Sequence, residues 1–284
     1  MFLDLTTVGA RTGPASIPMH WRDAVLYALA VGAGPGEMDY LYEARGPRIL
    51  PTFWTALAFR ASGELLARVG APRESAVFGE CSVQVDPDAP PGWPGDHVLV
   101  SGRVAAIYAI GDLGIADLHL SIAGPDSKPL AHVQFQMYYP GGGPIGAPRP
   151  PRTSRPIAPA RVADWVRDLQ TRPEQALMYR LCGDDNPLHV DPAAAAGLPA
   201  ITHGRPILHG LCTFGFVGRA VALASGQAVT SLRARFSRPA WPGDTLVVEG
   251  FASGPTTQLR VRTRENPQDD VLSVVIATTR ERSR

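Results

Sequence analysis

The chain has 284 residues, of which 45% are hydrophobic and 19% charged, a composition ordinary for one large or two small globular domains with a substantial core. The formal net charge of +1 excludes a strong overall field that would attract nucleic acid or an anionic membrane surface. The three cysteines, Cys81, Cys182 and Cys212, are too widely spaced for a disulfide framework or a zinc site, so we expect a reducing, cytoplasmic compartment.

The N-terminal segment lacks the basic region and apolar run of a signal peptide. No stretch approaches the roughly 20 uninterrupted apolar residues that span a bilayer. We therefore expect neither a nucleic-acid partner nor a membrane segment.

The first half of the chain opens with apolar residues at helical spacing over 21–34, a segment that ends at Gly32 and Gly34. A second apolar segment, 49–70, also has helical character. Runs with alternating apolar and polar residues follow at 75–85, 97–111, 114–124 and 130–139. Alternation of this kind, with turn residues between the runs, predicts antiparallel strands.

Residues 138–161 are dense in Pro and Gly and are typical of an extended linker. They divide the chain into an N-terminal domain, 1–140, a linker, 141–160, and a C-terminal domain, 161–284. The second half has helical spacing from 162 to 183, a long apolar helix at 207–226, and strand-like runs at 231–240, 244–254, 257–266 and 270–280. Helix followed by antiparallel strands, twice over, predicts an α+β fold in which two sheets each wrap around a long helix.

The segment "YRLCGDDNPLHVDP", residues 179–192, is rich in carboxylates. Part of it is explained by local structure, because Asp191 followed by Pro192 is a typical helix start and Gly197 can end that helix. Asp185 is expected to face solvent. These interpretations leave Asp184 without a structural explanation, and with it the two polar residues that follow.

Those two residues are Asn186 and His189, and the downstream segment "PILHGLCTFGF" places Gly210 at the head of the long apolar helix. A lone His in a loop is more often structural than functional. Free N–H groups at a helix start stabilise negative charge, and a glycine lets a ligand approach them closely. An Asp, a His and such an N–H are the groups that addition of water to an activated double bond requires.

Together, "YRLCGDDNPLHVDP" and "PILHGLCTFG" closely resemble the MaoC-like, type 2 enoyl-CoA hydratases of the (R)-specific branch, whose pattern is approximately YRLSGDxNPLHxDP followed by PILHGLCT. The segments "RDAVLYALAVGAG", "YLYEARGPRILPTF" and "RFSRPAWPGDTL" look like eukaryotic-type members with two repeats on one chain. The resemblance implies a double hot-dog fold. It further implies that the C-terminal repeat is catalytic and that the N-terminal repeat accommodates the acyl chain.

The resemblance implies that Asp184 and His189 are the catalytic pair, that Asn186 supports the water and the pair, and that the Gly210 N–H binds the thioester oxygen. One member of the pair would accept a proton from water, and the other would protonate the α-carbon on the same face. The implied reaction is hydration of trans-2-enoyl-CoA to (3R)-3-hydroxyacyl-CoA, or the reverse dehydration. It needs no metal, nucleotide or flavin. The implied partners are an acyl-CoA or acyl-carrier-protein thioester and a second copy of the chain in a homodimer.

Four further residues are candidates for substrate binding. Trp54 stands where family members tend to have a smaller residue and would shorten or reshape an acyl tunnel. Arg235 and Arg238 are candidates for the CoA phosphates, although a solvated strand face explains them about as well. His209 is expected to shape the helix start, since neither it nor His203 has a carboxylate or Cys at metal-ligand spacing in the sequence.

Other functions stay open at the level of sequence. The same catalytic pair would serve a polyketide or other secondary-metabolite intermediate bound to a carrier protein. Hot-dog folds also serve thioesterases, so thioester hydrolysis is a further alternative. A non-catalytic thioester-binding partner is the last, and the intact set of Asp, Asn, His and Gly argues against it.

Overall fold

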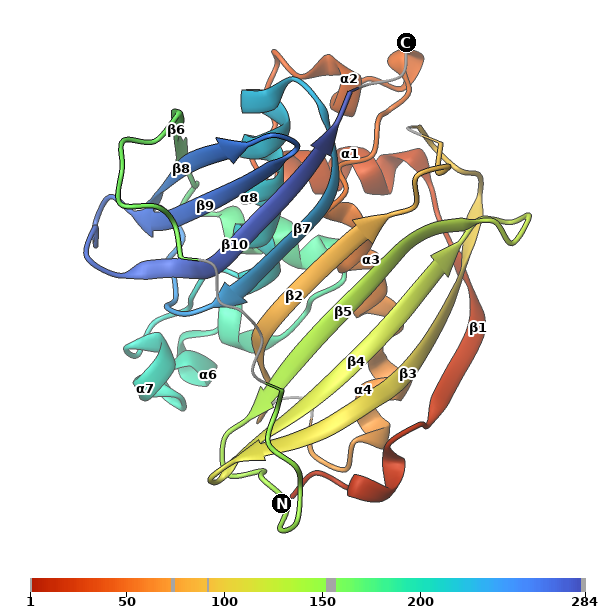
Figure 1. The fold of residues 1–284 in the computed structure, drawn as a ribbon, viewed down its shortest axis with the longest axis vertical. Coiled ribbons are helices and arrows are strands. Elements are labelled where there is room, and N and C mark those ends of the chain that lie inside the picture. Colours follow the sequence, from red (N-terminus) through yellow and green to blue (C-terminus); the bar gives the residue numbers. More distant parts are fainter. Residues whose placement is uncertain (1, 73–74, 91, 152–156, 282–284) are drawn as a thin grey trace.

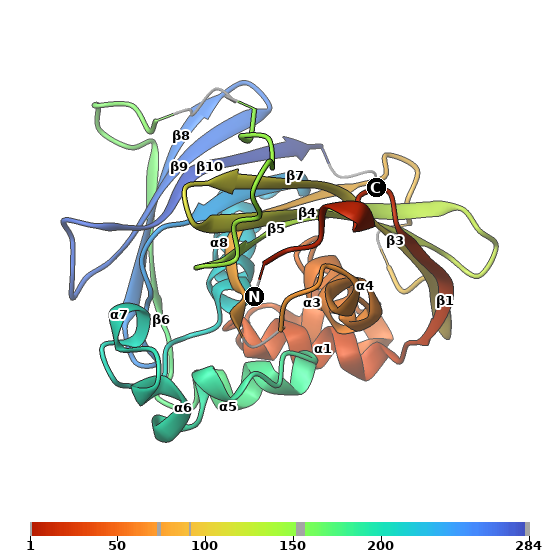
Figure 2. The same ribbon diagram turned by 90° about the horizontal axis from the view of Figure 1, so that it is seen from below.

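In this computed structural model the described residues are 2–72, 75–90, 92–151 and 157–281. They form one antiparallel sheet of ten strands in the order β1-β3-β4-β5-β2-β7-β10-β9-β8-β6 (Figure 1). Five strands come from each half of the chain, and the sheet curves around the helices so that β1 and β6 lie at its two turned-down edges (Figure 2). This is the predicted α+β double hot-dog architecture.

The strands of the N-terminal half are β1 (Arg11–Pro18), β2 (Val77–Val85), β3 (His97–Ile110), β4 (Leu113–Ala123) and β5 (Pro129–Tyr139). Those of the C-terminal half are β6 (Trp165–Gln170), β7 (Ala228–Phe236), β8 (Thr245–Ser253), β9 (Thr256–Thr263) and β10 (Asp270–Arg280). The predicted strands therefore occur at the expected places. The two halves join where β2 pairs with β7, between Glu80 opposite Arg235 and Gln84 opposite Ser231.

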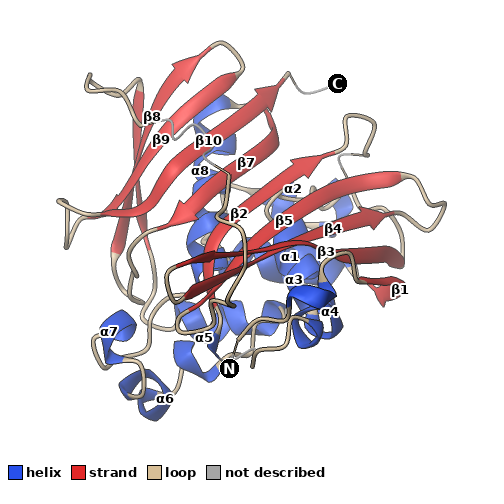
Figure 3. Cartoon of the chain, turned by 60° about the horizontal axis from the view of Figure 1, so that its bottom comes forward, coloured by secondary structure: helices blue, strands red, loops and turns tan. Residues whose placement is uncertain are grey.

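The helices gather on one face of the sheet (Figure 3). They are α1 (Trp21–Ala30), α2 (Met38–Leu41), α3 (Phe53–Ala61), α4 (Gly63–Arg68), α5 (Gln175–Tyr179), α6 (Pro192–Ala196), α7 (Pro199–Thr202) and α8 (Gly210–Ser225). Short 3-10 turns lie at η1 (Leu5–Thr7), η2 (Glu43–Arg45), η4 (Arg180–Cys182) and η5 (Pro187–His189). None of the described helices is long and apolar enough to cross a membrane.

Helix α8 is the central helix of the C-terminal half, and two glycines let the N-terminal half pack against it. A Cβ at Gly215 would lie 2.4 Å from Val31 of the N-terminal half, and one at Gly218 would lie 2.6 Å from Thr52. Val31 directly follows α1 and Thr52 directly precedes α3, so the two glycines bring the two halves together.

The corresponding helix of the N-terminal half is divided in two. After α3 the Ser62 hydroxyl donates a hydrogen bond to the Phe59 carbonyl at 2.7 Å, and α4 starts again at Gly63. A serine that bonds to the backbone of the preceding turn competes with helix continuation. The expected helical segment 49–70 thus becomes two short helices.

The prediction of helix at the start of 162–183 is wrong, because residues 165–170 form strand β6. The apolar residues Val162, Trp165, Val166 and Leu169 recur at helical spacing, but only Leu169 is buried. Strand β6 lies at an edge of the sheet and pairs only with β8, and the Trp165 ring lies over Gly250. Apolar side chains on an exposed edge strand produced the misleading periodicity.

Strand β1, which the sequence analysis missed, contains two prolines and forms the opposite edge of the sheet. Prolines are tolerated there because an edge strand leaves half of its N–H groups unpaired. Residues 152–156 of the predicted linker lie outside the described residues. The domain division at 140 and 161 stays a prediction, since one continuous sheet joins the two halves.

Candidate active site

The acidic loop 179–192 reverses direction at Gly183 and then forms two capped turns. Gly183 has φ +112°, a left-handed conformation that favours glycine, and an added Cβ would lie 2.9 Å from the Arg60 side chain. The Asn186 side chain then accepts the Leu188 N–H at 3.0 Å and caps the η5 turn that ends at His189. The structure therefore gives Asn186 a local role in holding the turn that carries His189.

The second cap is the predicted one. Asp191 accepts the Ala193 N–H at 2.8 Å, Pro192 is the first residue of α6, and Gly197 follows its last residue. Asp185 is exposed, as expected. The loop thus separates its carboxylates, and Asp184 is the one turned inward, with 5% of its surface exposed.

Asp184, Asn186, His189 and Gly210 all line one cavity of about 260 Å³, here called the catalytic cavity. Its walls come from both halves of the chain, since Phe59 and Phe78 face it from the N-terminal half. Ile201 of α7 also lines it, so the α6–α7 segment lies beside this cavity. The sequence-predicted catalytic residues therefore converge on a single space.

His189 is held in one tautomer. Its Nδ1 donates a hydrogen bond to the Ile207 carbonyl at 3.0 Å, because a carbonyl can only accept. The neutral ring therefore keeps a lone pair on Nε2. Burial lowers the pKa of His189 below its usual 6.5, and the nearby Asp184 charge and the bond to Ile207 oppose this shift only in part. At neutral pH, His189 is a neutral proton acceptor.

Gly210 is the first residue of α8. The first intrahelical bond runs from the Thr213 N–H to the His209 carbonyl at 3.1 Å, so the Gly210 N–H precedes the hydrogen-bond ladder of the helix. A Cβ at Gly210 would lie 3.0 Å from the Phe236 ring. The glycine thus keeps both the N–H and the space beside it, next to the positive end of the helix dipole.

His209 is fully buried and lies beside the predicted catalytic pair, Asp184 and His189. Its ring stacks on His189, with centroids 3.8 Å apart and planes 28° from parallel, and its Nε2 donates to the Asp184 carbonyl at 3.1 Å. Burial lowers the pKa of His209 well below its usual value, and the adjacent His189 lowers it further. His209 contacts both members of the pair without lining the cavity, which the sequence did not reveal.

Three potential metal ligands lie close together, since ligand atoms of Asp184, His189 and His209 are all within 4.8 Å of one another. The spacing of these residues along the sequence did not reveal that His209 lies near a carboxylate in the folded chain. However, the lone pairs of the two stacked imidazoles lie in nearly parallel planes, with ring centroids 3.8 Å apart, whereas a zinc ion needs lone pairs that converge on it at about 2.0–2.1 Å. The side chains do not fit a shared ion.

An aromatic wall formed by Phe59, Phe78 and Phe236 bounds the catalytic cavity. Phe59 and Phe236 each contact Phe78, with ring centroids 5.1 and 5.7 Å apart, and the fully buried Phe135 packs behind Phe59 and Phe78. These rings come from α3, β2 and β7. Sequence reasoning missed them because no local pattern brings the three together.

The remaining predicted substrate-binding residues lie in three different places. Trp54 is buried in α3 against Phe53, with ring centroids 5.6 Å apart, and Phe59 is the residue of that helix that lines the cavity. Arg238 lines the cavity and lies 3.9 Å from Asp269. Arg235 lines a different cleft on the outer face of the sheet. Their roles in binding stay predictions.

A hot-dog sheet with an Asp, a His and a helix-start glycine around one cavity defines a class of thioester-binding enzyme folds. Residues 148–272 match the MaoC like domain. The chain is 34% identical over 263 residues to 3-hydroxyacyl-thioester dehydratase Y of Mycobacterium tuberculosis, covering 87% of this chain and 86% of that protein. It is 35% identical over 268 residues to enoyl-CoA hydratase ChsH3 of the same organism, covering 89% and 91%. The chain belongs to the MaoC-like hydratase and dehydratase family.

Solved structures agree on the fold. A MaoC-like dehydratase from Phytophthora capsici aligns with a TM-score of 0.84 at 22% identity, covering 98% of each chain. The peroxisomal multifunctional enzyme type 2 of Drosophila melanogaster aligns with a TM-score of 0.78 at 27% identity. That alignment covers 95% of this chain and 48% of the Drosophila chain, so the present chain spans about half of that larger enzyme.

Proposed function

We propose that the protein is a hydro-lyase that adds water to trans-2-enoyl-CoA thioesters to give (3R)-3-hydroxyacyl-CoA, or catalyses the reverse dehydration. The observation that carries the proposal is the convergence of Asp184, His189 and Gly210 on one cavity. The names of the relatives, an enoyl-CoA hydratase and a 3-hydroxyacyl-thioester dehydratase, support the same reaction.

The proposed mechanism uses one water held between Asp184 and His189. The neutral His189 accepts a proton at Nε2 as the water oxygen attacks the β-carbon. The negative charge that develops on the thioester oxygen is stabilised by the Gly210 N–H. His189 passes the accepted proton to the ionised Asp184, which gives it to the α-carbon on the same face. The pair ends the cycle as it began, with Asp184 ionised and His189 neutral, and the water supplies both the hydroxyl group and the α-proton.

His209 and Asn186 complete the proposed site as positioning residues. The stacked, neutral His209 ring supports His189 from below and bonds to the Asp184 backbone. Asn186 caps the turn that ends at His189. Because neither residue needs to touch the reacting atoms in this scheme, loss of either should affect the rate through the geometry of the pair.

The relatives do not favour the alternative of a carrier-protein-bound intermediate, since the enoyl-CoA hydratase named above acts on a CoA thioester. Thioester hydrolysis is distinguished by its product. With crotonyl-CoA, hydration removes the enoyl absorbance without releasing a thiol, whereas hydrolysis releases free CoA. The proposal expects loss of absorbance, no free thiol, and a 3R product by chiral analysis. Thiol release in step with substrate loss would contradict it.

We further propose a cytoplasmic homodimer built from two domain-like repeats. The three cysteines are free, which suits a reducing compartment, and the edge strands β1 and β6 are available to a second copy. Light scattering coupled to size exclusion tests the assembly directly. A monomer at assay concentration would contradict the proposed homodimer and leave the proposed chemistry untouched.

A further inference from the structure

A strained residue in β10 controls which side chains of this strand face the catalytic cavity. Val274 has φ +55°, a left-handed conformation that β-branched residues rarely adopt. Ser273 and Ile276 lie three residues apart on β10, but their partners on β7, Arg235 and Arg233, lie two apart. Val274 is therefore the extra residue of a β-bulge. Backbone strain of this kind persists only where the surrounding structure holds it, and it is concentrated at functional sites.

The bulge is present against both neighbours of β10. Leu272 and Val275 are three residues apart, and they pair with Val261 and Leu259 of β9, which are two apart. A shift of one residue in register moves every following side chain to the other face of a sheet. The bulge therefore determines whether Leu272 or Ser273 faces the helices.

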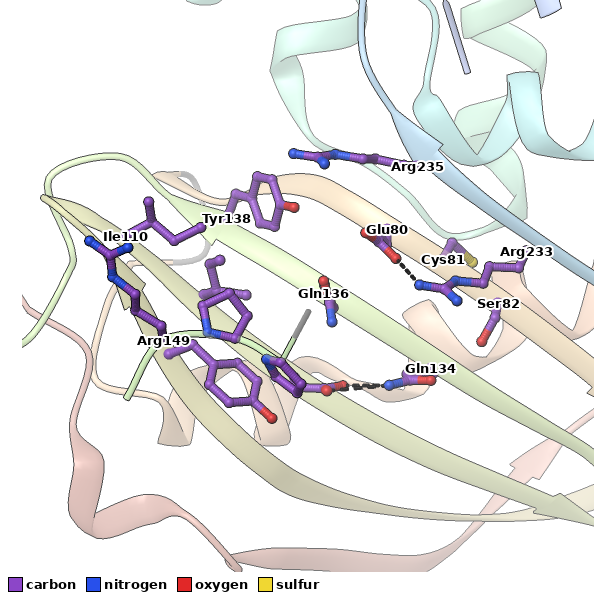
Figure 4. Close-up of a pocket in the computed structure, with 15 residues that line it drawn as sticks. Glu80, Cys81, Ser82, Ile110, Gln134, Gln136, Tyr138, Arg149, Arg233 and Arg235 are labelled. Atoms are coloured by element: carbon purple, nitrogen blue, oxygen red, sulfur yellow. Dashed lines mark hydrogen bonds and ion pairs between the residues drawn. The ribbon is translucent and has the colours of Figure 1, made fainter. Parts of the chain in front are cut away.

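Leu272 faces inward and Ser273 faces outward. Leu272 lies opposite Phe236 of β7, and both residues line the catalytic cavity. Ser273 lies opposite Arg235, which lines the cleft on the outer face of the sheet (Figure 4). The hydroxyls of Ser273 and Ser237 share a hydrogen bond at 2.6 Å. Without the extra residue, regular pairing would set Ser273 opposite Phe236, and its hydroxyl would point into the cavity.

The inward position of Leu272 is one side chain away from the start of α8. A Cβ at Gly210 would lie 3.0 Å from the Phe236 ring, and Leu272 is the cross-strand neighbour of Phe236. Residues directly opposite each other in an antiparallel pair have Cβ atoms about 4.5–5.5 Å apart. Val271, which is also buried, lines the same cavity. These side chains form an apolar surface beside the Gly210 N–H.

Two reactions of the same activated thioester are possible at such a site. A hydrogen bond from the Gly210 N–H to the thioester oxygen makes both the β-carbon and the carbonyl carbon more electrophilic. Water that adds to the β-carbon hydrates the double bond. Water that adds to the carbonyl carbon breaks the carbon–sulfur bond and gives the free acid and the CoA thiol. The position of the attacking water therefore selects the reaction.

We propose that Leu272, held inward by the bulge at Val274, keeps water away from the thioester carbonyl carbon and so confines the site to hydration. This inference rests on the proposed function, because it takes the thioester oxygen to bind at the Gly210 N–H. Apolar surfaces offer water no hydrogen-bond partner, and apolar cavities stay dry. A serine hydroxyl in the same position would instead bind a water beside the carbonyl carbon. Leu272 thus determines which reaction occurs.

Two substitutions at Leu272 separate the effect of a hydroxyl from the loss of packing. Leu272→Ala shortens the side chain and keeps it apolar, whereas Leu272→Ser shortens it by nearly the same amount and adds a hydroxyl. Each variant is assayed with crotonyl-CoA for two initial rates, the loss of the enoyl thioester absorbance and the release of free thiol. The measured quantity is the ratio of thiol release to absorbance loss.

We expect Leu272→Ser to raise this ratio at least about tenfold over the wild type, the effect of one hydrogen bond that holds a water. Leu272→Ala should keep the ratio close to that of the wild type, while its kcat/KM for hydration falls because apolar contact is lost. An unchanged ratio in Leu272→Ser would overturn the proposal, as would an equal rise in both variants.

Deletion of Val274 tests the same proposal by a second route. The deletion should restore regular pairing, turn Ser273 into the cavity and raise the ratio as Leu272→Ser does. Adding Ser273→Leu to the deletion should return the ratio to the wild-type value, because a leucine again faces inward. Ser273→Leu alone keeps the bulge, changes only the outer face and should leave both rates close to wild type. A rise that the added leucine does not reverse would contradict the proposal.

Circular dichroism shows whether the deletion variant folds, and the two substitutions at Leu272 decide the proposal if it does not. The wild type separates this inference from the proposed function. Hydration by the wild type with an unchanged ratio in Leu272→Ser sinks only the role of Leu272. A wild type that does not hydrate crotonyl-CoA sinks the proposed chemistry, whatever the variants do.

Discussion

The two halves of the molecule share a curved sheet and buried helices, yet they differ at the start of the central helix. In the C-terminal half, α8 begins with Gly210 beside an open cavity. In the N-terminal half, α3 begins with Phe53, whose ring packs against Tyr27 and Trp54 with centroids 5.6 Å from each. The N-terminus of the central helix therefore faces an open cavity in the C-terminal repeat, whereas aromatic side chains pack around it in the N-terminal repeat.

The two repeats also differ in the segments that precede these helices, because only the C-terminal repeat carries acid-base residues at these positions. Asp184 and His189 lie 26 and 21 positions before Gly210, the start of α8, whereas the residues at the same distances before Phe53, the start of α3, are Tyr27 and Gly32. A hot-dog repeat therefore supplies a helix start with positive potential, and the proposed mechanism requires in addition a small first residue and an acid-base pair nearby. The N-terminal repeat instead contributes Phe59 and Phe78 to the wall of the cavity.

The largest expected effect comes from removing His189, the proposed proton acceptor of the C-terminal repeat. We expect His189→Ala to lower kcat for crotonyl-CoA hydration by about 10³-fold or more, because it deletes the proton acceptor. His203→Ala, at an exposed position after α7, should remain close to wild type. Circular dichroism should show that both variants fold. A His189→Ala variant that keeps a tenth of wild-type activity would place the chemistry elsewhere.

The second prediction tests the contribution of the Gly210 N–H at the start of α8. Proline is tolerated at the first residue of a helix, and the preceding His209 already has φ −57° and ψ 134°, the region that residues before proline prefer. Gly210→Pro should therefore remove the N–H while the helix persists. Gly210→Ala keeps the N–H and adds only a Cβ near Phe236.

We expect Gly210→Pro to be slower than Gly210→Ala by about 10²-fold in kcat, the usual effect of losing one donor to a developing oxyanion. Steady-state hydration assays on the two purified variants measure this difference. Equal rates in the two variants would show that the Gly210 N–H does not bind the thioester oxygen.

A smaller effect concerns the wall supplied by the N-terminal repeat. Phe59→Ala should enlarge the catalytic cavity and raise the kcat/KM for a ten-carbon enoyl-CoA relative to crotonyl-CoA by roughly tenfold, since each methylene that becomes buried contributes about 0.8 kcal/mol. The matched control is Phe251→Ala, a buried phenylalanine on β8 outside the cavity lining. A similar shift in chain-length preference in both variants would argue that the wall has no part in selecting the chain.

The smallest expected effect is the pH dependence. Burial lowers the pKa of His189 below 6.5, so the neutral base persists at neutral pH and is lost only as the pH falls through that lowered value. The acid limb of kcat/KM for hydration should therefore have its midpoint below pH 6.5, with only a modest change between pH 8 and pH 7. A midpoint above 6.5 would show that His189 is stabilised in its charged form.

Much of the fold and the core of the site could be read from the sequence, because the informative residues are close together in the chain. Asp191 and Pro192 form the predicted cap, and α8 ends at Gly226, where φ is +66°. These features depend on local hydrogen bonds and backbone conformation, which short segments encode. The motif predicted that four residues lie close together, and they do line one cavity: Asp184, Asn186, His189 and Gly210. Their catalytic roles stay predictions.

The features that escaped sequence analysis depend on contacts between distant segments. Strand β6 has the apolar spacing of a helix, and only its pairing with β8 makes it a strand. The stacking of His209 on His189 joins residues twenty positions apart through the turn that carries the pair. Neither the partner of an edge strand nor the neighbour of a buried ring is encoded in local periodicity.

The most direct test of the central claim compares two adjacent aspartates in the same loop. Asp184 is buried in the catalytic cavity, and Asp185 is exposed, so Asp184→Asn and Asp185→Asn make the same chemical change at neighbouring positions. The measurement is kcat for hydration of crotonyl-CoA by each variant. We predict a loss of about 10³-fold for Asp184→Asn and a rate within about twofold of wild type for Asp185→Asn. Equal rates in the two variants would contradict the assignment of Asp184 to the reaction.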